Sequence, residues 1–261
     1  MIFKKLFNKK RWDKFRKDLT QGIIGNMLFI PSGSFLMGSN NGEMDERPVH
    51  NVLIDSFYMG EYEITQKEWY EVMETKPWEN LKYAKSGDKY PVVNVSWYDV
   101  KDYIEKLNNL TRKNFRLPTE AEWEYACRAG SSSKFFHGSL KYGLSNFAWY
   151  YDNAFKKDEM YGHEKGKKAP NKWGLYDMLG NVYEWCSDWY GNDYYNKSPV
   201  NNPKGPRYGS HKVIRGGDWS RTDYFLRVSS RRYYSPHSKD SFIGFRIVMD
   251  IGSKDEEVNC V

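Results

Sequence analysis

The sequence predicts an α+β fold with much irregular structure, and three observations support this class; the length of 261 residues permits one large domain or two. Aromatic residues make up 17% of the 261 residues, including 10 Trp and 21 Tyr, so we expect a core of large rings with hydrogen-bonded polar tips. The 21 glycines, many in turn pairs, predict much irregular backbone and exclude a helical bundle. Short strands come first, helices follow, and a long irregular β-rich half ends the chain, an order typical of α+β domains rather than of βαβ repeats.

The first 26 residues are predicted to form a basic appendage that precedes the domain. Residues 1–18 contain eight Lys or Arg residues and two Asp residues. A charge run of this kind is usually part of a solvated helix, and it is also the pattern of an arm that contacts an anionic surface. We therefore expect that this segment can touch an anionic surface, and we expect no specific nucleic-acid site.

We expect a cytoplasmic location, because the sequence shows no recognisable secretory signal or membrane span and its few cysteines are scattered. A surface or exported location stays open. Thr20-Gln21-Gly22 follows the basic start where the apolar part of a secretory signal would lie, and no run approaches the ~18 apolar residues of a membrane span. The cysteines Cys127, Cys186 and Cys260 are widely separated, so they form neither a disulfide framework nor a C-x-x-C metal pair.

The domain is predicted to begin with a β-hairpin. Residues 27–30 and 34–37 are short apolar runs separated by Pro31-Ser32-Gly33, which favours direct pairing of the two strands. Apolar residues alternate in pieces over residues 50–62, which indicates further sheet.

Three helices are predicted next, and each begins at a Ser or Thr that can cap its first turn. Thr65 with Glu68, and Thr119 with Glu122, match the capping box, in which the cap and the third helical residue exchange hydrogen bonds. Ser96 precedes the apolar stripe of the second helix. After the third helix we expect short strands within residues 145–155, 173–190, 211–218 and 243–249.

The stretch 171–185 is rich in glycine, aromatic and apolar residues, and two acids, Asp177 and Glu184, are set into it. An unpaired buried carboxylate is costly, so both acids need partners. One interpretation is a hard cation such as Ca²⁺, held by the two carboxylates and the backbone carbonyls between them. The other is a pair of turn-capping acids that are neutralised by Lys or Arg, and the spacing alone leaves both open.

The chain resembles the formylglycine-generating enzyme, or sulfatase-modifying factor, family over roughly residues 27–249. Several long motifs agree with that family at once and in the family's order. They include Arg116-Leu117-Pro118-Thr119-Glu120-Ala121-Glu122-Trp123-Glu124-Tyr125-Ala126, the stretch 173–190, Arg215-Gly216-Gly217 and Ile243-Gly244-Phe245-Arg246. The resemblance implies one C-type-lectin-like domain, which we place at residues 27–250, with a tail at 251–261.

The resemblance also favours the calcium interpretation of the stretch 171–185. Members of the family commonly hold Ca²⁺ in a loop that matches Asp177, the carbonyls of Gly180 and Val182, and Glu184 in this sequence. A second calcium site of the family would start near Asn146 and Phe147. We therefore expect Ca²⁺ as a structural cofactor.

The sequence departs from the catalytic members of the family in the segment that follows Arg215-Gly216-Gly217. In the formylglycine-generating enzymes this segment contains a Cys pair that binds copper(I) and activates O₂, and the enzyme uses it to oxidise a cysteine of a sulfatase. This chemistry needs two thiolates close together. Residues 218–227 contain no cysteine. We therefore expect no copper, and we assign no catalytic residue.

Residues 218–242 instead contain many side chains of the types that dominate binding surfaces, namely Trp, Tyr, Arg and His. We expect this segment to form a C-type-lectin-type surface for a protein or glycan ligand. The residues expected to contact the ligand are Asp218, Trp219, Ser220, Arg221, Asp223, Tyr224, Phe225, Arg231, Tyr233, Tyr234, His237 and Phe242.

The composition of this segment is also similar to that of the variable proteins of diversity-generating retroelements. In those proteins the same segment is mutagenised at adenines, and most polar residues of 218–242 can be reached by such changes from an Asn codon. Three hypotheses follow. The first is a non-catalytic binding protein, whose surface a retroelement would diversify in one version of the hypothesis. The second is an oxidoreductase of the formylglycine-generating type that acts on a protein cysteine, and the third is an accessory regulatory protein anchored by its basic N-terminus.

Overall fold

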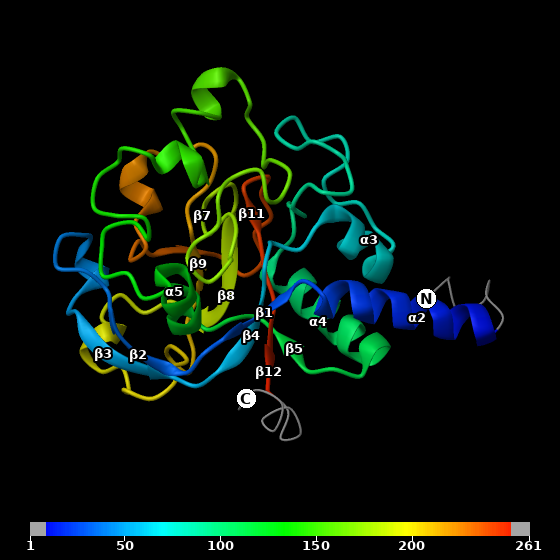
Figure 1. Ribbon diagram of the computed structural model, residues 1–261, viewed down its shortest axis with the longest axis horizontal. Helices are drawn as coiled ribbons and strands as arrows, with labels where there is room; N and C mark the ends of the chain where they lie inside the picture. Colours follow the sequence, from blue (N-terminus) through cyan, green and yellow to red (C-terminus); the bar gives the residue numbers. More distant parts are fainter. Residues whose placement is uncertain (1–8, 252–261) are drawn as a thin grey trace.

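The computed structural model describes residues 9–251, and these form an α+β arrangement of helices and short sheets (Figure 1). The predicted fold class is therefore confirmed. The predicted tail at 251–261 lies, beyond residue 251, outside the described residues. Most of the chain between the regular elements is turn and loop, as the glycine content predicts.

The three predicted helices are present, and each begins at its predicted cap. They are α3 (Gln66–Met73), α4 (Trp97–Thr111) and α5 (Glu120–Arg128). The side chains of Thr65, Ser96 and Thr119 accept a hydrogen bond from the third helical N–H, and the acid at that third position bonds back to the cap. Local capping therefore fixes where all three helices start.

The predicted pairing of the first two strands is wrong. The strands are β1 (Met27–Ile30), β2 (Gly33–Met37), β3 (His50–Ile54) and β4 (Phe57–Gly60). β1 pairs with β4 and β2 pairs with β3, both antiparallel, so the four strands form one long ribbon that bends at residues 31–32 and 55–56. Pro31 lacks an N–H, and its carbonyl accepts a hydrogen bond from Tyr125 Oη at 3.0 Å, so a tight hairpin does not form at this turn.

Two four-stranded sheets and a short parallel pair complete the strand arrangement of the described residues. The first sheet has the order β1-β4-β12-β5 and the second the order β10-β9-β8-β11. Their further strands are β5 (Phe115–Arg116), β8 (Tyr183–Trp189), β9 (Lys212–Arg215), β10 (Arg232–Tyr234), β11 (Ile243–Gly244) and β12 (Val248–Asp250). The parallel pair is β6 (Ala148–Trp149) with β7 (Leu179–Gly180), and the 3-10 turns are η1 (Met44–Glu46), η2 (Leu144–Asn146), η3 (Phe155–Lys157), η4 (Tyr194–Asn196) and η5 (Asp223–Leu226).

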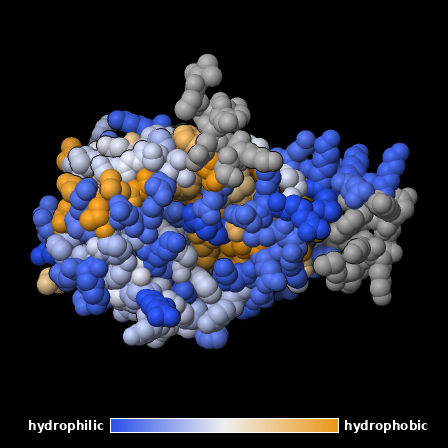
Figure 2. Space-filling view, turned by 90° about the horizontal axis from the view of Figure 1, so that it is seen from below, coloured by the Kyte–Doolittle hydropathy of each residue, from blue (hydrophilic) through white to orange (hydrophobic). Residues whose placement is uncertain are grey.

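The N-terminal segment is a helix, α2 (Lys9–Ile24), and its second half is packed on the domain. Leu19 and Ile23 are buried in the same apolar cluster as α4, and Arg16 Nε donates a 2.6 Å hydrogen bond to Leu110 O. Figure 2 shows hydrophilic side chains at the end of the molecule where α2 lies. The second half of α2 therefore contacts the apolar cluster of the domain, and the predicted boundary after residue 26 stays a prediction.

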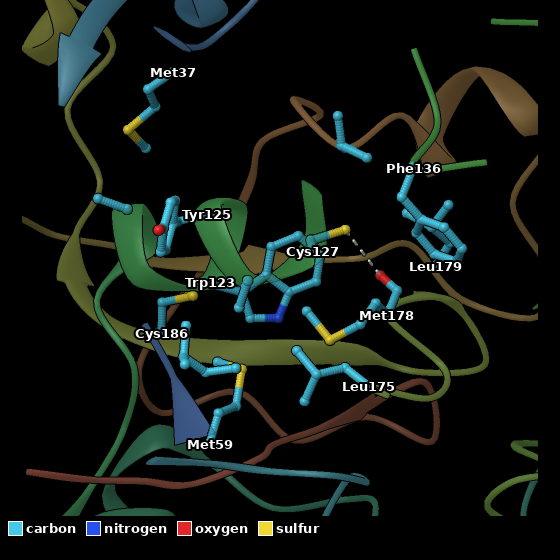
Figure 3. Packing of buried hydrophobic residues seen from close by; sticks show 14 of the residues in the cluster. Met37, Met59, Trp123, Tyr125, Cys127, Phe136, Leu175, Met178, Leu179 and Cys186 are labelled. Carbon is cyan, nitrogen blue, oxygen red and sulfur yellow. Dashed lines mark hydrogen bonds between the residues drawn. The ribbon is translucent and has the colours of Figure 1, made fainter. Parts of the chain in front are cut away.

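Large rings and sulfur-containing side chains fill the interior around α5 and β8 (Figure 3). Trp123 and Trp185 are completely buried, and each indole N–H has a partner: Trp123 donates to Glu184 at 2.7 Å and Trp185 to Val95 O at 3.1 Å. These two tryptophans match the expectation of rings with satisfied polar tips, whereas Tyr103 Oη, Trp149 Nε1 and Trp219 Nε1 are buried without a hydrogen-bond partner.

Buried arginine–glutamate pairs fasten the segment after β9 to α5. Arg231 is 1% exposed and makes a double hydrogen bond to Glu120, with Nε–Oε1 at 2.6 Å and Nη2–Oε2 at 2.8 Å. Arg215, at the end of β9, donates to the Glu124 carboxylate. Both glutamates lie one turn apart on α5, so a single helix holds two distant points of the segment.

A third buried pair fastens the same segment to the loop that joins β2 and β3. Arg227 makes a double hydrogen bond to Glu46, with both N–O distances at 2.6 Å. Burial of a charge is tolerable only when the charge is paired in good geometry, so these contacts specify the path of the backbone between residues 215 and 231.

We predict that Arg231→Ala lowers the free energy of unfolding by about 3–5 kcal/mol, because the substitution leaves the buried Glu120 with a longer 3.7 Å contact to Arg215 Nε as its charged partner. Chemical denaturation followed by tryptophan fluorescence measures the loss. Lys197→Ala is the control, because its ion pair with Asp193 is exposed and should contribute no more than about 1 kcal/mol. Equal losses in the two variants would contradict the prediction.

Candidate functional site

The predicted ligand surface divides into exposed and buried residues. Most of its side chains lie at or near the surface, on η5, on β10 and on the turns beside them. Tyr224 is 40% exposed and Tyr233 is 47% exposed. The predicted contact residues that are at least partly exposed are Ser220, Arg221, Asp223, Tyr224, Phe225, Tyr233, Tyr234, His237 and Phe242.

Three predicted contact residues are buried and serve the scaffold instead. Arg231 pairs with Glu120 as described, and Asp218 is 0% exposed. Asp218 Oδ1 accepts hydrogen bonds from the N–H and the hydroxyl of Ser220, both at 2.6 Å, which closes the turn. Trp219 is 4% exposed because other rings cover it. The expectation that Asp218, Trp219 and Arg231 face a ligand is therefore not met in this structure.

Residues that the sequence analysis did not select surround the exposed half of the segment. Tyr83 and Phe155 flank Trp219, with ring centroids at 6.1 and 6.2 Å. Tyr233 packs against Tyr190 at 4.2 Å, and His237 packs against Tyr98 at 4.8 Å. They come from distant parts of the chain, so no local pattern in the sequence links them to residues 218–242.

Arg221 occupies a distinct position on this surface. Its guanidinium lies over the rings of Tyr183 and Phe242, at 5.9 and 5.8 Å, and its Nε is 3.1 Å from Asp218 Oδ2. The side chain is nevertheless 42% exposed. A guanidinium held over rings and still open to solvent can offer its remaining N–H groups to an acceptor on a ligand.

A cavity of about 880 Å³ lies beside η5. Tyr224 and Arg227 line it together with Phe35, Tyr125 and Trp173. The Tyr125 ring packs against Phe35 at 5.3 Å and against Trp173 at 5.0 Å, which makes a continuous aromatic wall. Serine hydroxyls of the loop 131–133 add hydrogen-bonding groups to the lining. The cavity is therefore lined on one side by Tyr224 of the predicted ligand segment and on another by the aromatic wall of Phe35, Tyr125 and Trp173.

The predicted cation loop contains a buried ion pair. Arg246 makes a double hydrogen bond to Glu184, with both N–O distances at 2.6 Å, and Glu184 Oε2 also accepts from Trp123 Nε1 at 2.7 Å. Arg246 further donates to the carbonyls of Gly60 and Tyr176, each at 3.0 Å. This is the neutralising pair that the second sequence interpretation describes, so Glu184 has a partner without a metal.

Asp177 has no such partner. Its Oδ2 accepts a 3.0 Å hydrogen bond from Gly166 N, whereas its buried Oδ1 has no hydrogen-bond partner. Burial raises the pKa of Asp177 to about 6, and burial together with the nearby Asp177 and Glu184 charges raises the pKa of Glu63 well above its usual value. Three buried carboxylates therefore surround one guanidinium, which leaves negative charge that a proton or a cation would neutralise.

Some of the oxygen atoms in the predicted cation loop could bind calcium. Asp177 Oδ1 is an unpaired oxygen at the predicted position, and a carboxylate oxygen such as Glu184 Oε1 has a second lone pair beyond its bond to Arg246. Within residues 9–251, no group of three or more His, Cys, Asp or Glu side chains is arranged to hold a metal ion. Any calcium in this loop would thus depend on backbone carbonyls, as at Gly180 and Val182.

The second predicted calcium position lies at the end of η2. Asn146 O accepts a 2.8 Å hydrogen bond from Ala169 N, and Phe147 packs against Phe136 and His137 at 5.4 and 4.7 Å. Asn146 and Phe147 thus stabilise the local loop, and calcium there stays a prediction.

The two cysteines in the described part of the chain lie far from the exposed segment's surface. Cys127 and Cys186 are both 0% exposed in the core (Figure 3). Burial raises the pKa of both thiols well above the usual range, so neither forms a thiolate readily. Both thiols are therefore expected to be protonated at neutral pH, and the absence of copper stays a prediction.

A buried acid and a buried lysine support the strand beneath the segment. Asp188 Oδ2 accepts hydrogen bonds from Glu120 N at 3.0 Å and from the Ser187 hydroxyl at 2.9 Å. Burial, and then the nearby Glu120 charge, raise the pKa of Asp188 to about 7. Lys212 donates to Ser187 O at 2.7 Å, and burial lowers its pKa to about 8.

The chain is similar in sequence to a known protein family and to several characterised proteins. Residues 14–251 match the family model described as the sulfatase-modifying factor enzyme 1-like domain. The chain is 34% identical over 254 residues to a protein of Chlamydia pneumoniae named serine/threonine-protein kinase pkn1, with 88% of this chain and 39% of that protein aligned. It is 28% identical to the formylglycine-generating enzyme of Mus musculus, with 87% of this chain and 76% of that enzyme aligned. The chain thus spans about two fifths of the length of the chlamydial relative.

Solved structures confirm the fold. Treponema denticola variable protein 1 superposes with a TM-score of 0.78 at 30% identity, over 86% of this chain and 95% of that chain. PvdO from Pseudomonas aeruginosa superposes with a TM-score of 0.76 at 29% identity, over 86% of this chain and 94% of that chain. The C-type-lectin-like fold that the sequence resemblance implies is therefore correct.

We predict that the protein loses stability as the pH rises through the range in which Asp188 ionises. The folded state keeps a proton on Asp188 up to about pH 7, whereas the unfolded chain releases this proton near pH 4. The free energy of unfolding is therefore highest at low pH and falls as the pH rises from about 4 to about 7. Between about pH 5 and about pH 8 the loss should reach about 3 kcal/mol.

The control for this prediction is Asp188→Asn, whose amide resembles the protonated acid but does not titrate. Its free energy of unfolding, measured by urea denaturation at both pH values, should fall less steeply than that of the wild type. Identical pH dependence in the two proteins would exclude Asp188 as the cause.

Proposed function

The chain belongs to the sulfatase-modifying factor enzyme 1-like family, and we propose that it acts there as a non-catalytic binding protein. One observation carries the proposal. The segment 218–242 contains no cysteine, and it exposes aromatic, basic and hydroxyl side chains from a backbone whose buried arginines fix its path. Tyr and Arg are enriched at the energetically dominant positions of binding surfaces. When such side chains project from a fixed backbone, little conformational entropy is lost on association.

We propose that the ligand, a protein or a glycan, contacts both the exposed segment and the adjoining hollow. Tyr224 belongs to both, because it is an exposed residue of the segment and also lines the cavity of about 880 Å³. Its hydroxyl donates a hydrogen bond to Glu43 at 3.0 Å. The aromatic wall formed by Phe35, Tyr125 and Trp173 offers apolar area, and the serines of the loop 131–133 offer hydrogen bonds. Such a mixture suits a sugar chain or a polar polypeptide segment.

We further propose that the exposed positions are diversified by a retroelement. The likeness to Treponema denticola variable protein 1, at 30% identity, supports this proposal. So does the separation of the segment into buried supporting residues, such as Asp218 and Arg231, and exposed residues, such as Tyr224 and Tyr233. An adenine-rich near-copy of the coding segment for residues 215–246, beside a reverse transcriptase gene, would establish diversification, and the absence of both would exclude it.

Calcium is proposed as a structural ion of the loop that contains Asp177. The support is the unpaired, buried Oδ1 of Asp177 and the negative charge shared by Glu63, Asp177 and Glu184. Asp177 has a left-handed backbone (φ 56°), a conformation that Asn also adopts readily, so its charge can be removed without forcing the loop to change.

We predict that Tyr224→Ala combined with Tyr233→Ala abolishes binding on glycan and protein arrays while the protein stays folded. Exposed tyrosines at binding hot spots contribute about 2 kcal/mol or more each, so the double variant should bind at least about a thousandfold more weakly. The control is Tyr142→Ala with Tyr208→Ala, because both rings are exposed and lie outside the segment.

Two results would contradict the binding proposal. One is an equal loss of binding in the control variant. The other is copper-dependent conversion of a cysteine-containing sulfatase peptide to formylglycine by the wild-type protein, which would favour the oxidoreductase alternative suggested by the similarity to the Mus musculus enzyme.

We predict that calcium raises the melting temperature of the chelator-treated wild type and has a much smaller effect on Asp177→Asn. At a hundredfold excess over its dissociation constant, a ligand bound only by the folded state stabilises by about 2.7 kcal/mol. Differential scanning calorimetry measures the shift, with Asp193→Asn as an exposed-acid control. No shift in the wild type, or an equal shift in Asp177→Asn, would exclude this loop as the site.

A further inference from the structure

The charge of this protein is concentrated at one end of the chain. Residues 1–18 hold eight Lys or Arg and two Asp, a formal charge of +6, which equals the net charge of the whole chain. The other residues contain 32 basic and 32 acidic side chains and are formally neutral. The positive field therefore originates from the N-terminal segment and not from the binding domain.

The described part of this segment presents its charge on one face of α2. Lys10, Lys14 and Lys17 are exposed and follow the spacing i, i+4, i+7, so they project from the same side of the helix. Leu19 and Ile23 are buried on the side that packs against the domain. The helix is thus fixed on its apolar side and leaves a row of lysines toward solvent.

We propose that α2 attaches the domain to the surface of an anionic phospholipid membrane. Each Lys or Arg near such a surface contributes about 1 kcal/mol of attraction, which fades within a Debye length, so a compact basic run is effective where scattered charges are not. In the sequence, Ile2, Phe3, Leu6 and Phe7 alternate with Lys4-Lys5 just before the helix. Apolar and basic residues combined in this way are typical of segments that lie on a membrane.

Two further observations bear on how α2 would attach. Residues 19–261 are formally neutral, so the net electrostatic attraction to an anionic surface would come from the N-terminal segment. No helix in the described range, 9–251, is long and apolar enough to cross a membrane. Attachment by α2 would therefore be peripheral and reversible by salt.

The position of α2 suits this role. It projects from one end of the molecule, and η5 (orange) lies at the opposite end (Figure 1). Attachment through α2 therefore leaves the exposed turn 223–226 directed away from the membrane. The inference rests on the charge and placement of α2, and it is independent of the proposed binding function.

The test is sedimentation of the full chain with vesicles of phosphatidylcholine plus phosphatidylglycerol, compared with vesicles of phosphatidylcholine alone. The wild type should bind the anionic vesicles selectively and should dissociate when the ionic strength is raised to about 1 M, where the Debye length falls to about 3 Å. Lys10→Gln with Lys14→Gln and Lys17→Gln should bind on the order of a hundredfold more weakly, since three charges at about 1 kcal/mol each are lost.

The matched control is Lys67→Gln with Lys172→Gln and Lys204→Gln, which removes the same charge from exposed positions outside α2 and should bind like the wild type. Gln and Lys have similar helix propensities, so circular dichroism should show unchanged helix content in the α2 variant. Equal weakening in the control, equal binding to neutral vesicles, or tighter binding to a DNA duplex than to anionic vesicles would each overturn the proposal.

Discussion

The buried contacts between the carboxylates of α5 and two arginines hold the structure that displays the binding surface. Glu120 receives Arg231, and Glu124 receives Arg215 and also Arg128 from its own helix. These groups are charged, and a buried charge that loses its partner is far more costly than an exposed one, so the contacts allow one backbone path. Because the path is set from the inside, we expect the exposed side chains between the arginines to contribute less to folding than the buried ones.

A further guanidinium, that of Arg246, performs a similar task on the other side of Trp123, whose ring contacts Arg215 and whose indole N–H donates to Glu184. Arg246 pairs with Glu184 on β8 and donates to the carbonyls of Gly60 and Tyr176, so it joins three segments that share few strand contacts. In a chain with little regular structure, loops leave many backbone carbonyls without strand partners, and five N–H donors on one planar group can satisfy several at once. The proposed calcium loop lies beside this arginine, where Asp177 remains unpaired.

The sequence predicted what depends on neighbouring residues and missed what depends on distant ones. The caps at Thr65, Ser96 and Thr119 are local, and all three helices begin there. The pairing of β1 with β4 is not local, and the predicted hairpin is wrong for that reason. Within residues 218–242, Arg221 and Arg231 are the same residue type, yet only a fold that brings Glu120 near Arg231 decides which of them is buried.

The central claim is that this segment has an internally fixed backbone and an exchangeable surface. A substitution scan of residues 218–242, with folded protein recovered after protease treatment of a displayed library, tests it most directly. We expect that most substitutions are tolerated at the exposed Thr222, Tyr224 and His237, and that few are tolerated at the buried Asp218 and Arg231. Equal tolerance at the exposed and the buried positions would contradict it.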